Sequence, residues 1–174
     1  MSDPPVTPMA ERAHPAIGIR PYRASDLDGV RRLVEAVLTE FGFAHTIGGI
    51  ERDLVHIAER YGAGGDGAAA FWVADSDGAI VGTVAVRAKD GDAEPGTCEL
   101  KRLYLDPGWR GRGLGQALYE QAESFARAAG YRRIWLDSSR RFAKAHRLYA
   151  RNGFVLLAQL DNDWEDNVYE KRLL

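Results

Sequence analysis

Residues 98 to 130 read CELKRLYLDPGWRGRGLGQALYEQAESFARAAG, and this stretch decides the fold. It begins as an apolar strand, passes through three glycines and two arginines, and continues with the three-and-four spacing of an amphipathic helix. Glycine in a helical window costs about 1 kcal/mol relative to alanine. Because Gly111, Gly113 and Gly115 stand together at the helix start, the sequence predicts a function there that offsets this cost.

The start of a helix is a natural place to hold an anion. Its first amide groups have no partner within the helix, and the helix dipole places a partial positive charge there. Glycines let the backbone approach an anion closely, and Arg110 and Arg112 add positive charge. The pattern predicts a pyrophosphate cradle, with a tight strand-to-helix turn carrying solvated arginines as the alternative.

Two other phosphate-binding motifs fit this stretch poorly. The dinucleotide fingerprint G-x-G-x-x-G would need a glycine where Gln116 or Leu118 stands. A P-loop needs a Gly-Lys pair followed by Ser or Thr, and the sequence contains no Gly-Lys pair. A nucleotide-binding module that uses the cradle for other phosphates therefore ranks last.

Composition favours one globular domain. The chain has 174 residues, of which 45% are hydrophobic, and its net charge is −2. This balance argues against a dedicated nucleic-acid binder. No apolar run approaches the roughly 20 residues that cross a membrane, and one cysteine, Cys98, allows no internal disulfide. We expect a cytoplasmic protein with a disordered tail over residues 1–15 and a single domain over residues 16–174.

The order of elements predicts a mixed α/β domain with antiparallel hairpins and a central strand-helix-strand unit. Predicted strands cover 16–22, two runs within 70–88 around the turn Ser76-Asp77-Gly78, the segment that begins at Cys98, 132–139, 154–160 and 167–174. Predicted helices are one capped by Ser25, one over 50–62, one that ends at Gly130, and one over 140–153 capped by Ser139.

Two motifs resemble those of a known family. The pattern Arg110-x-x-Gly113-x-Gly115 resembles the acyl-CoA motif of the GNAT superfamily of N-acetyltransferases, and AHRLYARNGF at 145–154 resembles its second motif, A-x-x-L-Y-x-x-x-G-F. The resemblance covers roughly residues 16–174. It implies the GNAT fold: a mixed, mostly antiparallel sheet of about seven strands, splayed between strands 4 and 5, with about four helices.

The resemblance also implies acetyl-CoA as acyl donor, and no metal. Main-chain groups of Leu103 and Leu105 would pair with the pantetheine arm, the Leu103 amide would donate to the thioester carbonyl, and Tyr104 belongs to the same cofactor-binding segment. The amides expected to hold the pyrophosphate are those of Arg110, Gly111, Arg112, Gly113, Leu114 and Gly115. No His/Cys cluster has metal-ligand spacing.

The resemblance assigns two catalytic roles. Glu99 would be the general base that takes a proton from the amine, although it could instead be a surface carboxylate paired with Lys101 or Arg102. Tyr149 would be the general acid that reprotonates the CoA thiolate, or else a core tyrosine. Phe142 departs from the family, many of whose members carry asparagine seven residues before this tyrosine.

Other reactive side chains have simpler predicted roles. Cys98 is expected in the core rather than in an acyl-cysteine relay. His146 is expected at the surface, and His45 and His56 are expected to be structural. The family usually transfers the acyl group directly within a ternary complex.

The sequence names the donor better than the acceptor. The resemblance implies an acceptor pocket formed by residues 40–45 and 161–166, where four carboxylates surround Trp164. A primary amine of a small molecule is expected there, with amino acids, antibiotics and protein N-termini as further possibilities. The four carboxylates could attract a cationic amine or form a solvated turn. The alternative function is a non-catalytic acyl-CoA-binding regulatory module. A homodimer is possible, and no nucleic-acid or membrane partner is expected.

Overall fold

The computed structural model describes residues 16–43, 54–62, 68–91, 95–164 and 166–173. The predicted tail over 1–15 and the first part of the predicted helix over 50–62 lie outside the described residues. The strands are β1 (Ile17–Pro21), β2 (Ala70–Ser76), β3 (Ala79–Ala88), β4 (Thr97–Leu105), β5 (Arg133–Ser139), β6 (Val155–Gln159) and β7 (Asp166–Arg172). The helices are α1 (Leu27–Glu40), α3 (Ile57–Tyr61), α4 (Leu114–Ala128) and α5 (Ala143–Arg151), with 3₁₀ turns η1 (Ala24–Asp26) and η2 (Pro107–Trp109).

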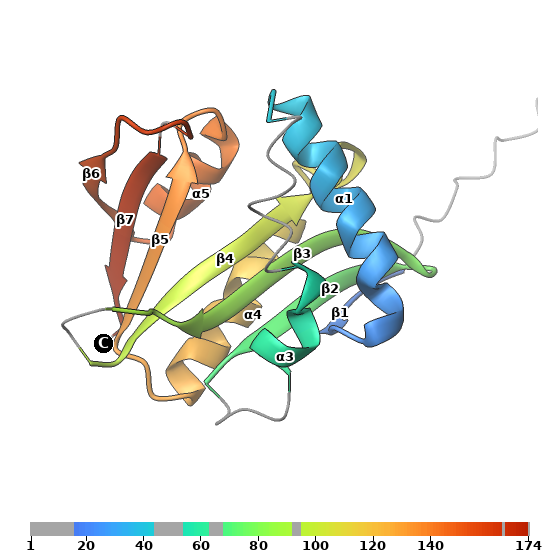
Figure 1. Ribbon diagram of the computed structural model, residues 1–174, viewed down its shortest axis with the longest axis horizontal. Helices are drawn as coiled ribbons and strands as arrows, with labels where there is room; N and C mark the ends of the chain where they lie inside the picture. Colours follow the sequence, from blue (N-terminus) through green and yellow to red (C-terminus); the bar gives the residue numbers. More distant parts are fainter. Residues whose placement is uncertain (1–15, 44–53, 63–67, 92–94, 165, 174) are drawn as a thin grey trace, which may run out of the picture.

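The strands form one seven-stranded sheet in the order β1-β2-β3-β4-β5-β7-β6 (Figure 1). Every neighbouring pair is antiparallel except β4 and β5, which run parallel with α4 as their crossover. The β2–β3 turn has φ +50° at Asp77 and +86° at Gly78, as a two-residue hairpin requires. The predicted mixed, mostly antiparallel sheet is confirmed.

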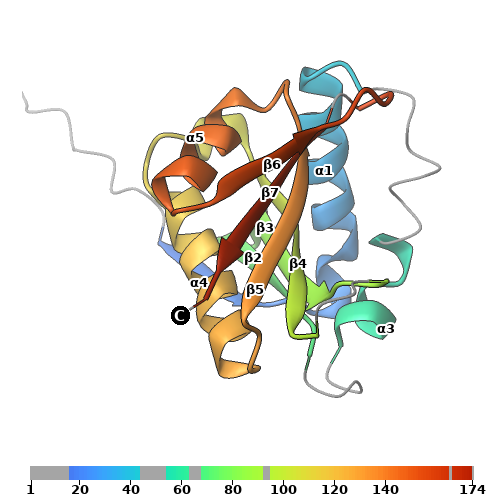
Figure 2. The ribbon, with the colours of Figure 1, turned by 90° about the vertical axis from the view of Figure 1, so that its left-hand side faces the viewer.

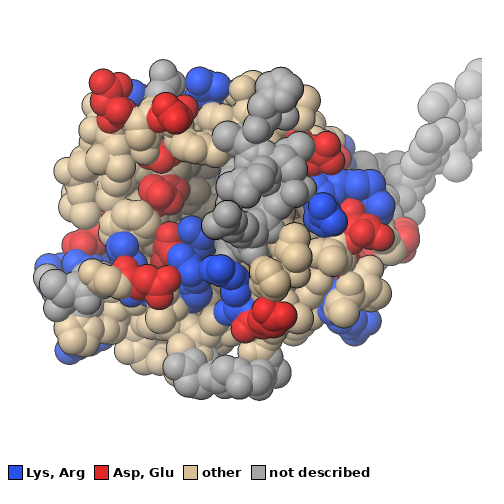
Figure 3. Space-filling view, in the orientation of Figure 1, with Lys and Arg blue, Asp and Glu red and all other residues tan. Residues whose placement is uncertain are grey.

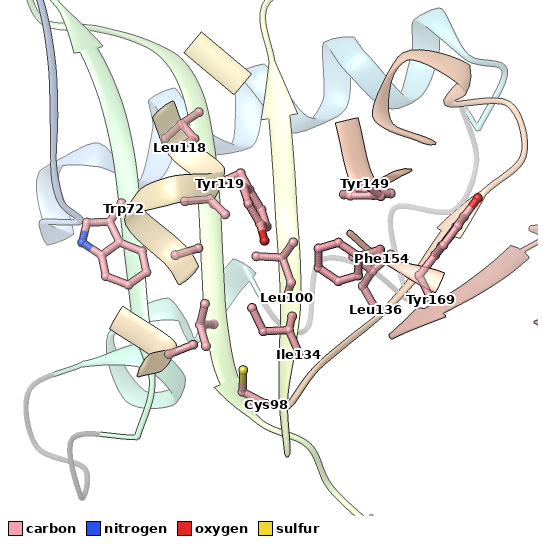
Figure 4. Packing of buried hydrophobic residues seen from close by; sticks show 14 of the residues in the cluster. Trp72, Cys98, Leu100, Leu118, Tyr119, Ile134, Leu136, Tyr149, Phe154 and Tyr169 are labelled. Carbon is pink, nitrogen blue, oxygen red and sulfur yellow. The ribbon is translucent and has the colours of Figure 1, made fainter. Parts of the chain in front are cut away.

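Helices cover both faces of the sheet and define two apolar clusters. Figure 2 shows α4 and α5 on one face and α1 and α3 on the other. The first cluster packs α4 and α5 against the sheet and includes Leu118, Tyr119, Ile134 and Tyr149 (Figure 4). The second packs α1 and α3 against β2 and β3. Since strand residues alternate between faces, β2, β3 and β4 each supply side chains to both clusters.

The centre of the sheet opens because β4 and β5 pair only briefly. Thr97, Cys98 and Glu99 pair with Arg133, Ile134 and Trp135, and no later pair forms among the described residues. Beyond these three pairs the strands diverge, with β5 staying on β7 and β4 staying on β3 (Figure 1). The predicted splay between strands 4 and 5 is therefore present.

The wedge between the diverging strands is bordered by a bulge in β4. The register shifts by one residue because Thr83 faces Tyr104 while Ala85 faces Lys101. Arg102 adopts φ +57°, a conformation uncommon for a residue with a side chain. The Thr83 hydroxyl donates to the Arg102 carbonyl over 2.7 Å and holds this conformation. Bulges of this kind redirect a strand, and they are common beside active sites.

Both predicted serine caps differ from the structure. Ser25 lies inside η1, and α1 begins at Leu27, because the chain first makes a 3₁₀ turn around Asp26. At α5 the Ser139 carbonyl accepts from the Phe142 amide over 3.0 Å, and the helix begins four residues after Ser139, at Ala143. In both cases a tight turn precedes the α-helix.

An arginine clamp joins the start of α1 to the sheet. The Arg20 guanidinium on β1 donates to both carboxylate oxygens of Asp26, over 2.7 and 2.8 Å, and to Asp75 on β2. Asp26 is buried and also accepts from the Arg23 amide. The hydrogen bonds from Arg20 hold the pKa of Asp26 below its usual range.

We expect Asp26→Asn to lower the free energy of unfolding at neutral pH by about 1 to 3 kcal/mol, because it removes charged hydrogen bonds from a buried site. A carboxylate whose folded pKa is lowered stabilises the protein above its unfolded pKa and loses that effect as pH falls. The difference from wild type in urea unfolding should therefore shrink toward about pH 3. Asp77→Asn, at an exposed turn, is the control. A difference that stays constant with pH would contradict this account.

Candidate active site

The loop before α4 has the geometry of an anion cradle. Gly111 and Gly113 have φ +75° and +83°, the left-handed region that favours glycine, and Gly113 is the N-cap of α4. A Cβ atom at either position would meet no atom within 4 Å, so both glycines face open space. The first amides of α4 have no partner within the helix. These amides can therefore donate to a phosphate.

Gly115 differs from the other two glycines. A Cβ there would lie 3.5 Å from Leu148 and 3.6 Å from Leu105, which are ordinary contact distances. Gly115 therefore lies where α4, α5 and β4 pack together rather than at a point of backbone strain.

The two arginines of the loop behave differently. The Arg110 side chain donates to the Leu105 carbonyl over 3.0 and 3.1 Å and to Glu40 at the end of α1 over 2.7 and 2.8 Å. The Arg110 guanidinium thus connects the loop to α1 and β4 through these hydrogen bonds. Arg112 is exposed, with its guanidinium 5.5 Å from the Trp109 ring. Of the two loop arginines, Arg112 is thus the one with an exposed side chain.

The main chain of β4 at the wedge has few partners. At the bulge Leu103 has no Cα partner on β3, and β5 has already diverged on the other side. The Leu105 carbonyl is already engaged by Arg110. Tyr104 is paired with Thr83 and its side chain packs with the α1 cluster. Leu103 therefore has the backbone best placed to pair with a ligand in the wedge.

Glu99 is buried within ion pairs. Its side chain is only 8% exposed, one oxygen accepts from Arg87 over 2.8 and 2.9 Å, and the other accepts from Lys101 over 2.8 Å. Burial alone would raise the pKa of Glu99, but Lys101 and Arg87 outweigh it and lower that pKa. The pairing expected with Lys101 is present, while Arg87 takes the place of Arg102. Both oxygens of the predicted base are occupied.

Tyr149 extends from α5 into the first apolar cluster. It is 5% exposed, and its ring lies 5.7 Å from those of Phe154 and Tyr169 (Figure 4). Burial raises the pKa of Tyr149, although a hydrogen bond with the Ser138 side chain opposes that rise. Tyr149 thus keeps its proton at neutral pH. Its contact with Ser138 places it beside the part of β5 that has left β4.

The histidines need one correction. His146 was expected at the surface, and this prediction is wrong because the residue is half-buried. Its Nε2 lies 2.9 Å from the Ser139 carbonyl oxygen, and its Nδ1 lies 3.2 Å from the Tyr169 hydroxyl. Residues three apart on a helix share a face, so His146 lies beside Tyr149. Burial lowers the pKa of His146. His56 is exposed and pairs with Glu59, and His45 lies outside the described residues.

Cys98 is a core residue, as predicted. It is fully buried in the first cluster, and burial raises the pKa of its thiol to about 12. A thiol that stays protonated is a poor nucleophile, which disfavours an acyl-cysteine relay.

An aromatic wall lies on the α1 side of the wedge. We use this name for Phe41 and Phe43 after α1, Phe142 before α5, Tyr104 on β4 and Trp164 between β6 and β7. Phe142 packs edge-on against Phe41 with ring centroids 4.8 Å apart, and Trp164 stacks on Phe43 at 4.6 Å. Phe142, noted in the sequence as a departure from the family, joins segments that the sequence could not show to be neighbours.

The sequence reasoning missed one carboxylate, Asp137 on β5. It is exposed, and among the described residues no side chain pairs with it. Protein atoms around Asp137 reduce the hydration of its carboxylate and raise its pKa. Lys101 opposes this rise, whereas Asp166 and Glu99 add to it. The signal was present in RRIWLDSS, where alternation puts Asp137 on the face opposite Ile134 and Leu136.

The surface of this region is hollowed. Figure 3 shows a depression between the β5–β7 part and the side that carries α1, bordered by both acidic and basic side chains.

Among the described residues no group of three or more His, Cys, Asp or Glu side chains could hold a metal ion. Within the same residues, no helix is long and apolar enough to span a membrane.

Similar proteins agree with this geometry. The acetyltransferase (GNAT) family matches residues 31–154. An uncharacterized N-acetyltransferase of Schizosaccharomyces pombe is 34% identical over 129 residues, which are 74% of this chain and 76% of that protein. Human N-acetylaspartate synthetase is 38% identical over 92 residues, which are 53% of this chain but 30% of that protein.

Solved structures share the fold. A GNAT-family acetyltransferase of Staphylococcus aureus superposes with a TM-score of 0.79 at 23% identity, covering 91% of this chain and 100% of that one. The protein yncA of Salmonella typhimurium, solved with its cofactor acetyl-CoA, gives 0.69 at 19% identity, covering 90% and 94%. With the glycine cradle at the open end of the β4–β5 wedge, the chain belongs to the GNAT acetyltransferase family and is an acetyl-CoA-dependent N-acetyltransferase.

Proposed function

We propose that the protein transfers an acetyl group from acetyl-CoA to a primary amine of a small molecule, by direct attack in a ternary complex. The observation that carries the proposal is the wedge between β4 and β5, with the open glycine cradle at one side and the aromatic wall at the other. Donor and acceptor can then approach from opposite sides and meet at the bulge of β4. Such positioning removes much of the entropic barrier to a bimolecular reaction.

The donor is held mainly by backbone groups in this proposal. The amides from Arg110 to Gly115 hold the pyrophosphate, with Arg112 adding positive charge. The pantetheine arm pairs with β4 at Leu103 and Leu105, and the Leu105 carbonyl shares its acceptor capacity with Arg110. The Leu103 amide donates to the thioester carbonyl oxygen, where negative charge develops as the amine attacks.

The acceptor is proposed to combine an apolar body with a cationic amine. The aromatic wall offers a surface for the apolar part, and the carboxylates of β5 and of the β6–β7 connection favour a cation. A small amine rather than a long peptide suits a wall that is already closed by the stack of Trp164 on Phe43. The partial likeness to N-acetylaspartate synthetase supports a small amine acceptor.

Two proton transfers accompany the reaction. The ammonium form of an alkyl amine has a pKa near about 10 and must lose a proton before its nitrogen can attack. We assign this task to the carboxylates beside the wedge, with Glu99 as the base predicted from the sequence. To accept a proton itself, Glu99 must release Arg87 or Lys101, or act through water. Tyr149 then donates a proton to the departing thiolate.

The test is release of free CoA thiol from acetyl-CoA over a panel of amines that includes amino acids, polyamines and arylalkylamines. Acetyl-CoA-dependent thiol release with one class of amine, and an acetylated product of matching mass, is the expected result. Tight binding of acetyl-CoA without turnover on any amine would favour the regulatory-module alternative.

Gly113→Asp should abolish acetyl-CoA binding, because it places bulk and negative charge where the pyrophosphate lies and strains a backbone at φ +83°. Calorimetric titration measures the effect. Gly130→Asp is the matched control, since Gly130 follows the same helix at its other end with φ +81° and equally open surroundings. If Gly113→Asp binds acetyl-CoA as tightly as wild type, the cradle is misplaced.

Tyr149→Phe should lower kcat by about 10²-fold or more while leaving acetyl-CoA affinity unchanged, because only the proton donor is removed. Tyr131→Phe, which removes a hydroxyl bound to the Ala68 carbonyl, is the control for loss of a tyrosine hydroxyl. An unchanged kcat would return Tyr149 to a purely structural role.

A further inference from the structure

We propose that Asp137, not Glu99, is the group that receives the proton from the acceptor's ammonium, while Glu99 remains ionised behind it. This inference rests on the proposed function, in which the carboxylates beside the wedge take up the proton of the amine.

The position of Asp137 follows from the sheet. Pairing between β4 and β5 ends at Glu99 and Trp135, and Asp137 is the second residue of β5 beyond that point. On its other side β5 continues to pair with β7, opposite Val168. Since Ile134 and Leu136 point into the first apolar cluster, alternation puts Asp137 on the same face as Trp135 and Glu99. The carboxylate therefore lies on the side of the wedge that carries α1.

The two carboxylates differ in how accessible they are to a substrate in the wedge. Glu99 is buried, with its oxygens accepting from Arg87 and Lys101. Asp137 is exposed, and no described side chain donates a hydrogen bond or forms an ion pair with it. A base must come within hydrogen-bond reach of the proton that it removes, directly or through one water. Asp137 meets this condition without any ion pair breaking first.

The surroundings of Asp137 also favour its acting as a base, because they raise its pKa. Protein atoms around the open carboxylate reduce its hydration and raise its pKa, and the anions Asp166 on β7 and Glu99 on β4 raise it further. Lys101 on β4 is the cation that lowers it. Two tyrosines that are neutral at pH 7 also interact with it, Tyr104 from β4 and Tyr149 from α5. Glu99, in contrast, has its pKa lowered by its two cations.

Tyr149 forms a hydrogen bond with the side chain of Ser138, which follows Asp137 on β5, so the proposed acid and base lie at neighbouring positions of that strand. In the first step the ammonium gives one proton to Asp137, and the nitrogen lone pair attacks the thioester carbonyl carbon. The carbon–sulfur bond then breaks, and the sulfur takes the Tyr149 proton. As the amide forms, its nitrogen loses a second proton, which reaches Tyr149 through solvent and restores the Tyr149 hydroxyl. Asp137 releases its own proton to water. The products are the acetylated amine, CoA thiol and one proton.

The experiment compares the pH dependence of kcat/KM in wild type, Asp137→Asn and Glu99→Gln, with Asp77→Asn as control. Asp137→Asn should lose about 10²-fold or more in kcat, keep its acetyl-CoA affinity, and lose the acid-side limb of the profile. Glu99→Gln should keep that limb but move it to lower pH, because an anion that raises the pKa of Asp137 is gone and Lys101 is freed. Loss of the limb in Glu99→Gln with its retention in Asp137→Asn would overturn the inference.

A second measurement needs no amine substrate. Carbon-13 NMR titration of the aspartate carboxyls, assigned with Asp137→Asn, should show Asp137 titrating above the usual value of about 4, and at lower pH in Glu99→Gln. Titration of Asp137 at or below the usual value would overturn the inference even in a protein that turns over no amine. Failure of the proposed function is a separate result: no thiol release by wild type with any amine.

Discussion

The parallel contact between β4 and β5 ends after three residue pairs, and the candidate active site depends on that divergence. Strand backbones carry donors and acceptors that must find partners. On β5 they find β7, whereas on β4 a bulge shifts the register with β3 at Leu103, just where β5 has moved away. At the centre of the sheet, β4 thus continues past its pairing with β5, and Leu103 lies at the bulge beside the wedge. The Thr83 hydroxyl stabilises the bulge, and α4 begins beyond the end of β4.

The sequence predicted the backbone of this arrangement well. The hairpin turn and the apolar periodicity are local signals, and they led to the β2–β3 turn and the seven strands. The glycine pattern led to the proposed cradle. The residues of the second motif led to Tyr149, whose buried position on α5 fits either a catalytic or a core role. The left-handed conformations of Gly111 and Gly113 give the physical reason why glycine stands there. The third glycine, Gly115, lies instead at a packing contact.

Contacts between side chains of distant segments could not be predicted from such local signals. Arg110 adds positive charge in the sequence, yet in the structure its side chain binds Glu40 and the Leu105 carbonyl. Glu99 was predicted as a base, but its partner Arg87 comes from the neighbouring strand. The aromatic wall joins segments more than 100 residues apart. Each depends on strand order and register, which local patterns do not fix. The wrong surface position predicted for His146 had a different cause, because helical spacing alone is enough to place His146 beside Tyr149.

The central claim is that acetyl-CoA lies in the wedge with its pyrophosphate on the glycine cradle. Calorimetric titration with acetyl-CoA and with S-acetylpantetheine, which lacks the pyrophosphate and nucleotide, tests this claim most directly. We expect acetyl-CoA to bind at one site per chain and S-acetylpantetheine to bind far more weakly, because the cradle supplies much of the affinity. Equal affinity for the two compounds, or no binding of acetyl-CoA, would contradict this claim.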